Sequence, residues 1–182
     1  MRVVVLLSGG IDSMACVKFY LAQGYEVEGI FFEYEQPSVN SEHAAATKIA
    51  EYYGIQLRIV QLPHLQADAS GEIHGRNAIF ALCTLGIYGY GAYKIAIGIH
   101  SGTQYPDCSI GFVDRVNRLY DIYANGTVAL EAPFAYWTKE QIIVYCKEHF
   151  LPIELTYSCE MGFIKPCGKC NSCLDRKAWL NE

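Results

Sequence analysis

Residues 8–13 read SGGIDS, and they join an apolar run, Val3–Leu7, to a helix-like segment, Ser13–Gln23. Two glycines at such a turn let the backbone approach a ligand, and the free N–H groups at the start of a helix attract an anion. A helix terminus alone contributes only about 0.3–1 kcal/mol, so phosphate binding also needs the hydroxyl groups of Ser8 and Ser13. The lysine of the common NTP-binding loop is absent. The stretch predicts a different phosphate-binding turn, with an ordinary capped turn as the alternative.

Strand-like and helix-like segments alternate on either side of this turn. This alternation predicts an α/β fold, in which a parallel five-stranded sheet carries helices on both faces in a Rossmann-like arrangement. Ligands of such sheets bind beyond the carboxyl ends of the strands. Thr138 and Gln141 have the spacing of a capping box at the last helix. The expected strands are Val3–Leu7, Val27–Phe32, Gln56–Leu62, Lys94–Ile99 and Thr127–Glu131, and the expected helices are Ser13–Gln23, Ser41–Tyr53, Asn77–Gly89, Ile110–Tyr123 and Lys139–Phe150.

The composition limits the organisation of the chain and its partners. With 182 residues, of which 52% are hydrophobic, we expect one α/β domain over residues 1–150 and a small module over residues 151–182. The net charge of −5 argues against direct nucleic-acid binding. Because strand-like sequence begins at once, we expect a cytoplasmic protein. Residues 78–93 carry no formal charge, but they are fewer than the roughly 20 that a membrane span needs, so we expect a buried helix and no membrane association.

The eight cysteines of the chain are not expected to form disulfides in a reducing compartment. Four of them, Cys159, Cys167, Cys170 and Cys173, form a C-x7-C-x2-C-x2-C array. Four thiolates around one ion suit zinc, so we predict a structural zinc site. A redox pair and an iron–sulfur cluster are the alternatives. Three further cysteines are expected in the apolar core: Cys16, Cys83 and Cys146.

Four motifs in this order resemble the 7-cyano-7-deazaguanine synthase family, over nearly the whole chain. They are SGGIDS at 8–13, HGRNAIF at 74–80, YPDC at 105–108, and CGKCNSC at 167–173 with Cys159 upstream and Arg176 downstream. The first is similar to the pyrophosphate loop of ATP pyrophosphatases, whose fold is adenine-nucleotide alpha-hydrolase-like. The resemblance implies a homodimeric ligase with one zinc per chain. It would use ATP and Mg²⁺ to adenylate the carboxylate of 7-carboxy-7-deazaguanine, then transfer it to ammonia, giving an amide and finally the nitrile.

The resemblance also implies roles for individual residues. Asp12 would face magnesium or the polyphosphate. Tyr105 and Asp107 would lie beside the deazapurine, with an ordinary Tyr-Pro-Asp turn as the alternative. Arg76 and Asn77 would lie near the nucleotide or base, with a plain loop-to-helix cap as the alternative. The implied catalytic residues are Asp12, Ser13 and Asp107; the implied nucleotide contacts are Ser8, Gly9, Gly10, Asp12, Ser13, Arg76 and Asn77; and the implied substrate contacts are Arg76, Tyr105 and Asp107.

The chain departs from the family pattern on the acceptor side. The family usually has Phe-Asp-Tyr-Gly-Gln and then basic residues after the second strand, whereas residues 32–38 read FEYEQPS. The segment Leu62–Gly75 is short, and the approach to Tyr105 reads HSGTQ, without the usual acidic residue. We therefore expect a more open acceptor site. A variant that joins the deazaguanine to a larger amine, such as a protein amino terminus in a phage-defence system, competes with nitrile synthesis.

Two other functions use the same features. A tRNA thiolation enzyme would have the same loop, but it would need a reactive cysteine pair and a basic face. A zinc-stabilised binding module without activity would keep the loop only as a relic. The presence of both glycines, both serines and Asp12 in the loop argues against that second alternative.

Overall fold

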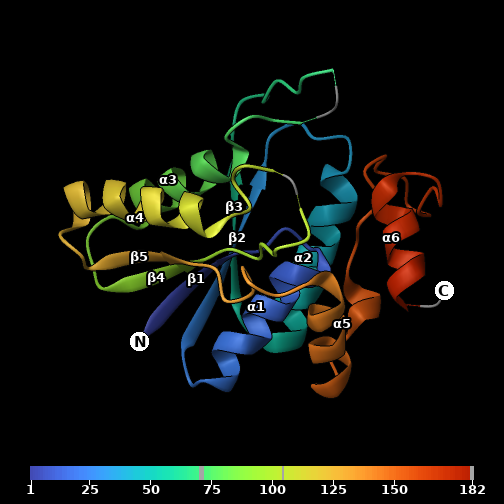
Figure 1. Ribbon diagram of the computed structural model, residues 1–182, viewed down its shortest axis with the longest axis horizontal. Coiled ribbons are helices and arrows are strands. Elements are labelled where there is room, and N and C mark those ends of the chain that lie inside the picture. Colours follow the sequence, from blue (N-terminus) through green and yellow to red (C-terminus); the bar gives the residue numbers. More distant parts are fainter. Residues whose placement is uncertain (70–71, 104, 181–182) are drawn as a thin grey trace.

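A computed structural model describes residues 1–69, 72–103 and 105–180, and it contains one parallel sheet (Figure 1). The sheet has the order β3-β2-β1-β4-β5. Its strands are β1 (Arg2–Leu6), β2 (Glu26–Glu33), β3 (Gln56–Gln61), β4 (Tyr93–Ala96) and β5 (Val128–Glu131). The predicted α/β class and the five-stranded parallel sheet are confirmed. Parts of three expectations lie outside the described residues: positions 70 and 71 of the short segment, Gln104 of the HSGTQ stretch, and positions 181 and 182 of the tail.

Helices cover both faces of the sheet, as the alternating pattern predicts. They are α1 (Ile11–Ala22), α2 (Val39–Tyr53), α3 (Arg76–Tyr88), α4 (Ile110–Ala124), α5 (Lys139–Glu148) and α6 (Asn171–Leu180), with a 3-10 turn, η1 (Ile153–Leu155), before the last. Because side chains alternate along β1, Val3 and Val5 pack with α1, α2 and α5. Val4 and Leu6 pack with α3 and α4 on the other face.

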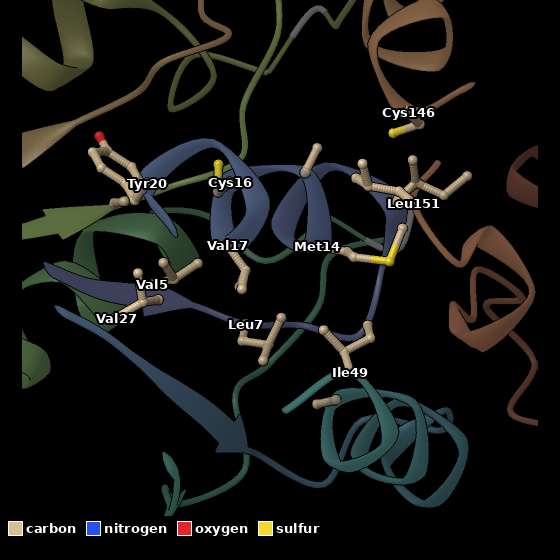
Figure 2. Packing of buried hydrophobic residues seen from close by; sticks show 14 of the residues in the cluster. Val5, Leu7, Met14, Cys16, Val17, Tyr20, Val27, Ile49, Cys146 and Leu151 are labelled. Carbon is tan, nitrogen blue, oxygen red and sulfur yellow. The ribbon is translucent and has the colours of Figure 1, made fainter. Parts of the chain in front are cut away.

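The cluster on the first face shows how α1 is held in place (Figure 2). Met14, Cys16 and Val17 of α1 are fully buried. Figure 2 shows Leu7 on one side of the helix and Cys146 on the other. Cys16 and Cys146 are therefore core residues, as predicted, whereas Cys83 is only partly buried. Since α1 carries the SGGIDS turn at its start, this packing fixes the turn to the sheet.

The strand order places a topological switch point beside that turn, which is where open parallel sheets form their ligand crevice. β1 pairs with β2 on one side and with β4 on the other, so the chain leaves β1 and β4 in different directions. In open parallel sheets this is where ligands bind, beyond the carboxyl ends of the strands. Residues 7–10 follow β1 and residues 97–109 follow β4. The SGGIDS and YPDC motifs therefore belong to the two loops that border the crevice.

Several element ends differ from the sequence prediction by one to three residues, and the ends of β4 and α5 have a visible cause. β4 ends at Ala96, not Ile99, because Gly98 turns against α1: a Cβ atom built on Gly98 would lie 2.8 Å from the carbonyl carbon of Asp12. α5 ends at Glu148, and Phe150 has a φ of 52°, outside the helical region. Within the described residues, no helix combines the length and apolar character needed to cross a membrane.

The tail folds around its cysteines and packs beside α2 and α5. Its helix α6 was not predicted from the sequence. Arg176 ties α6 to the preceding turn, because its guanidinium donates to Thr156 Oγ1 at 2.8 Å and to the Ile153 carbonyl at 3.2 Å. Trp179 and Leu180 at the end of α6 pack against the first core cluster. Residues 151–180 therefore lie directly on the α/β layer that carries the SGGIDS turn.

Candidate functional site

The SGGIDS turn has the geometry of an anion site. Gly9 has a φ of 83°, and a Cβ atom there would lie 2.6 Å from the Glu42 carbonyl oxygen, so only glycine fits. Gly10 is the N-cap of α1 in an extended conformation, and no side chain caps the helix. Ser13 donates to the Gly10 carbonyl at 2.9 Å, and Ser8 donates to Ser13 Oγ at 3.2 Å. The first N–H groups of α1 are thus left without a side-chain cap, next to two hydroxyl groups.

Asp12 forms an ion pair that the sequence did not predict. The Lys139 ammonium lies 2.6 Å and 2.7 Å from the two carboxylate oxygens. The side chains are 24% and 11% exposed for Asp12 and Lys139, respectively. Among the residues that the structure describes, Lys139 is the only buried lysine or arginine. A positive charge is therefore fixed beside the candidate phosphate site.

The sequence contained a signal that could have identified Lys139 as a residue of the site. The capping box of Thr138 and Gln141 is confirmed by both of its hydrogen bonds, and it makes Lys139 the first residue of α5. A cation at a helix N-terminus opposes the helix dipole. A lysine in this position, following a strand of a parallel sheet, is consistent with a nearby carboxylate or phosphate.

His100 follows β4 and is also buried near this pair. Its Nδ1 accepts the N–H of Gly102 at 3.1 Å, so the proton of the neutral ring is on Nε2. Burial lowers the pKa of His100, and the nearby Lys139 charge acts in the same direction, while the Asp12 charge partly offsets both. No sequence motif predicted His100 at this site, and it is buried because the chain turns inward beside Gly98.

The HGRN and YPDC motifs meet on the other side of the crevice. The backbone N–H of Asn77 donates to Asp107 Oδ2 at 3.2 Å, and Asn77 Nδ2 donates to the Asp107 carbonyl at 3.2 Å. Asp107 therefore caps the start of α3, 30 residues away. Arg76 points toward Tyr34 and donates to its hydroxyl at 3.4 Å. Tyr105 is 52% exposed, as suits a side chain that would cover a ligand.

The four tail cysteines form a compact sulfur cluster. Their Sγ atoms lie within 4.8 Å of one another, and the Sγ atoms of Cys167 and Cys173 are 4.0 Å apart. Tetrahedral zinc with bonds of about 2.3 Å requires sulfur separations close to these. The Cys167 N–H donates to Cys159 Sγ, and the N–H groups of Lys169 and Cys170 donate to Cys167 Sγ. These residues fit a tetrahedral metal ion.

The acidity of the thiols agrees with this interpretation. Burial raises the pKa of Cys159, but the N–H groups of Cys167 and Met161 outweigh that effect and bring it to about 6. Burial raises the pKa of Cys173 to about 12, and the neighbouring thiols add to the rise. Four thiolates together therefore require a cation. A second cluster of possible metal ligands contains Asp68, Glu72 and His74, and it is partly exposed to solvent. Within this cluster, His74 Nε2 lies 3.1 Å from the Asp68 carboxylate.

The tail contacts the SGGIDS turn directly. The Tyr157 N–H donates to the Gly9 carbonyl at 3.0 Å. The indole ring of Trp179 lies against Lys139, with its centroid 5.1 Å from Nζ. A Cβ atom on Gly162 would collide with the Pro37 carbonyl, and Ser41 donates to the Gly162 carbonyl at 3.3 Å. The structure thus brings the predicted residues into three groups: the turn, the Arg76–Asp107 side and the cysteines, with the cysteine tail packed on the turn.

Solved structures with this fold include two synthetases. NMN synthetase from Francisella tularensis has a TM-score of 0.58 and 12% sequence identity, and the match covers 99% of this chain and 83% of that one. NH3-dependent NAD synthetase from Campylobacter jejuni has a TM-score of 0.54 and 16% identity, over 85% of this chain and 66% of that one. These likenesses confirm the adenine-nucleotide alpha-hydrolase-like fold. The chain is a parallel α/β protein with a glycine–serine loop and a four-cysteine tail.

The chain belongs to the family described as Queuosine biosynthesis protein QueC, whose model matches residues 2–71 and 66–182. It is 33% identical to 7-cyano-7-deazaguanine synthase 2 of Desulfitobacterium hafniense, over 94% of this chain and 85% of that protein. It is 31% identical to 7-cyano-7-deazaguanine synthase of Prochlorococcus marinus, over 99% of this chain and 95% of that protein. The resemblance read from the four motifs is confirmed.

The comparisons also indicate that this chain is shorter than its relatives in places. The alignment with the Prochlorococcus marinus protein runs over 215 positions, more than the 182 residues of this chain. That relative therefore carries segments without a counterpart here. The family model matches in two pieces that meet at residues 66–71, inside the segment Leu62–Gly75.

Proposed function

We propose that this chain is an ATP-dependent ligase that activates the carboxylate of 7-carboxy-7-deazaguanine and transfers the acyl group to an amine. The observation that carries the proposal is the uncapped start of α1, which lies beside two serine hydroxyls and the fixed charge of Lys139. This arrangement suits a polyphosphate chain better than a neutral ligand. The names of the relatives supply the substrate class.

The reaction divides into two steps. In the first step, a carboxylate oxygen of the substrate forms a bond to the α-phosphorus of ATP, and pyrophosphate leaves. In the second step, the amine nitrogen forms a bond to the acyl carbon, AMP leaves with the carboxylate oxygen, and the nitrogen loses a proton. With ammonia the product is an amide. The amide oxygen then forms a bond to the α-phosphorus of a second ATP, pyrophosphate leaves, and loss of AMP with two N–H protons gives the nitrile.

The residues of the turn would hold the leaving pyrophosphate. The N–H groups of α1 and the hydroxyls of Ser8 and Ser13 would donate to its oxygens, which disperses the charge that develops as the bond breaks. Lys139 would add a positive charge in a partly buried place, where water screens it little. Asp12 would orient Lys139 and bind Mg²⁺, and the bound ion neutralises phosphate charge.

The opposite side of the crevice would hold the deazapurine. Asp107 is fixed by its two contacts with Asn77, so its Oδ1, which has only a weak contact with Cys108 Sγ at 3.9 Å, could accept from the N–H groups of the base. Tyr105 and Arg76 would cover the base and orient its carboxylate, respectively. The sulfur cluster would hold zinc, which supplies structure to the tail when bound. A homodimer and a cytoplasmic location remain part of this proposal.

Product analysis tests the activity. The protein is incubated with ATP, Mg²⁺, ammonium and 7-carboxy-7-deazaguanine, and pyrophosphate release and the small-molecule products are measured. We expect pyrophosphate release that depends on the substrate, with Asp12→Asn much slower at a temperature where a melting curve shows that it is folded. Pyrophosphate release that does not depend on the substrate would refute the proposed reaction. Equal rates in the variant and the parent would refute the role of Asp12.

The same assay tests the acceptor side. Because the segment Leu62–Gly75 is short, the adenylate should be reachable by whichever amine is held nearest, and positioning an amine can be worth roughly 7–11 kcal/mol. We therefore expect adenylate or amide to form readily and the nitrile to form slowly. A larger amine, such as a protein amino terminus, should compete with ammonium. Rapid and complete nitrile formation with ammonium alone would contradict an open acceptor site.

A further inference from the structure

Two contacts join the cysteine tail to the two parts of the nucleotide site. One is the hydrogen bond from the Tyr157 N–H to the Gly9 carbonyl, 3.0 Å long. The other is the indole ring of Trp179, 5.1 Å from the Lys139 ammonium. The first lies where the tail begins and the second lies at the end of α6. The tail therefore contacts both the glycine turn and the lysine that pairs with Asp12.

Trp179 limits where the Lys139 ammonium can go. A lysine has four rotatable bonds, and its ammonium is strongly hydrated wherever water can reach it. The Lys139 side chain is nevertheless only 11% exposed, and its ammonium contacts both the Asp12 carboxylate and the indole ring. An aromatic face attracts a cation and also excludes water from it. The indole is therefore placed to keep the ammonium close to the carboxylate.

The sulfur cluster sets the position of Trp179. The helix α6 begins at Asn171, between two of the cysteines. The N–H groups of Cys173 and Leu174 both donate to the Cys170 carbonyl, so the first turn of α6 is built onto the cluster. Trp179 lies six residues beyond Cys173, roughly 9 Å along the helix axis. Any change of the cluster that tilts α6 would be passed to the indole.

We propose that Trp179 is a positioning residue that holds the Lys139 ammonium against Asp12, so that the cysteine tail sets the charge geometry of the nucleotide site. The proposal rests on the proposed use of ATP. The cysteine tail then has a role beyond stability, because its Trp179 indole lies at the edge of the nucleotide site. Trp179 itself needs no contact with ATP for this role.

The first test compares three variants of the full-length protein. Trp179→Ala should weaken the binding of Mg²⁺-ATP by roughly 5- to 30-fold, seen by calorimetry and as a higher KM for ATP with little change in kcat. Trp179→Phe keeps an aromatic face and should restore most of the affinity. Leu174→Ala removes an exposed apolar side chain from the same helix and should bind ATP like the parent. Metal content and melting temperature are measured for each variant.

The outcomes separate the two proposals. If the parent protein does not bind Mg²⁺-ATP, the proposed function fails. If the parent binds ATP and Trp179→Ala binds it equally well, the role of Trp179 is overturned. The same holds if Trp179→Ala loses affinity only in proportion to lost metal or lost melting temperature, since the effect would then be structural.

A second readout does not depend on activity. The chain has two tryptophans, so in a Trp137→Phe background the emission comes from Trp179 alone. Removal of metal by a chelator should shift this emission to the red, because α6 would release the indole into water. Mg²⁺-ATP added to the untreated variant should also change the emission, because the phosphates would bring negative charge close to the ammonium that the indole contacts. Emission that stays constant in both experiments would contradict the coupling of the tail to Lys139.

Discussion

The contact between Asp12 and Lys139 can be measured by a double-mutant cycle. The four proteins are the parent, Asp12→Asn, Lys139→Met and the double variant. The two charged atoms are 2.6 Å apart, and their side chains are only 24% and 11% exposed. Hydrogen bonds to charged groups contribute about 1.5–3 kcal/mol, whereas exposed ion pairs contribute about 0.2–1 kcal/mol. Because this pair is partly buried, we expect a coupling of about 1–2 kcal/mol.

The losses of unfolding free energy in the two single variants should add up to more than the loss in the double variant. Lys139→Met leaves a carboxylate without its partner and should cost about 1–3 kcal/mol, reduced from the cost of a fully buried pair by the exposure of Asp12. For a chain of this length, each kcal/mol lowers the melting temperature by roughly 2–4 °C. In the double variant neither charge remains, so its loss should be smaller than the sum of the two single losses.

The assay is urea unfolding followed by circular dichroism, at one salt concentration for all four proteins. Coupling should persist when the salt concentration is raised, because water screens a partly buried pair less than an exposed one. If the losses of unfolding free energy in the two single variants sum to the loss in the double variant within about 0.3–0.5 kcal/mol, the pair does not interact. That result would also remove the basis for placing a fixed positive charge beside the turn.

Two further predictions concern the tail and the acceptor side. Cys170→Ser should lower metal content and melting temperature together, because binding of the metal and folding of the tail are one process; a purified parent protein with bound iron, or with less than one zinc per chain, would contradict the zinc assignment. Glu35 has a φ of 62°, where L-residues are strained by about 1–2 kcal/mol, and its side chain is 73% exposed. Glu35→Gly should therefore leave the free energy of unfolding unchanged or raise it by up to about 1 kcal/mol, since the gain in chain entropy on unfolding offsets part of the relieved strain. If the free energy of unfolding instead falls by more than about 1 kcal/mol, the contact of Glu35 with His64 stabilises the protein.

Local signals in the sequence were sufficient for the sheet and for the turn. Alternating strand and helix patterns predicted each strand of the sheet, and the box of Thr138 and Gln141 placed the start of α5 at its observed residue. The helix α6 was missed because its first residues are Cys173 of the sulfur cluster and the two spacer residues before it, which show no apolar period. In that segment the sulfur cluster, rather than a hydrophobic face, decides where the helix begins.

The partners within the site could not be predicted from local patterns. Asp12 and Lys139 are 127 residues apart, and Asn77 and Asp107 are 30 apart. Each pair forms only because the parallel sheet brings its loops to one edge. The family resemblance, rather than any local pattern, implied that Asp12 faces magnesium or the polyphosphate. The structure adds that its carboxylate already holds a lysine, so a ligand would have to share it or displace it.

The position of β3 explains how the acceptor side can differ while the rest of the chain keeps its form. β3 is an edge strand, and the loop after it closes partly on itself, since the Asp68 N–H donates to the Glu72 carbonyl at 2.9 Å. Halving the length of a flexible loop changes its closure free energy by only about 0.6 kcal/mol. Protein engineers could therefore graft longer segments between Leu62 and Gly75 without disturbing the sheet or the turn, and so test the proposed link between this segment and the choice of amine.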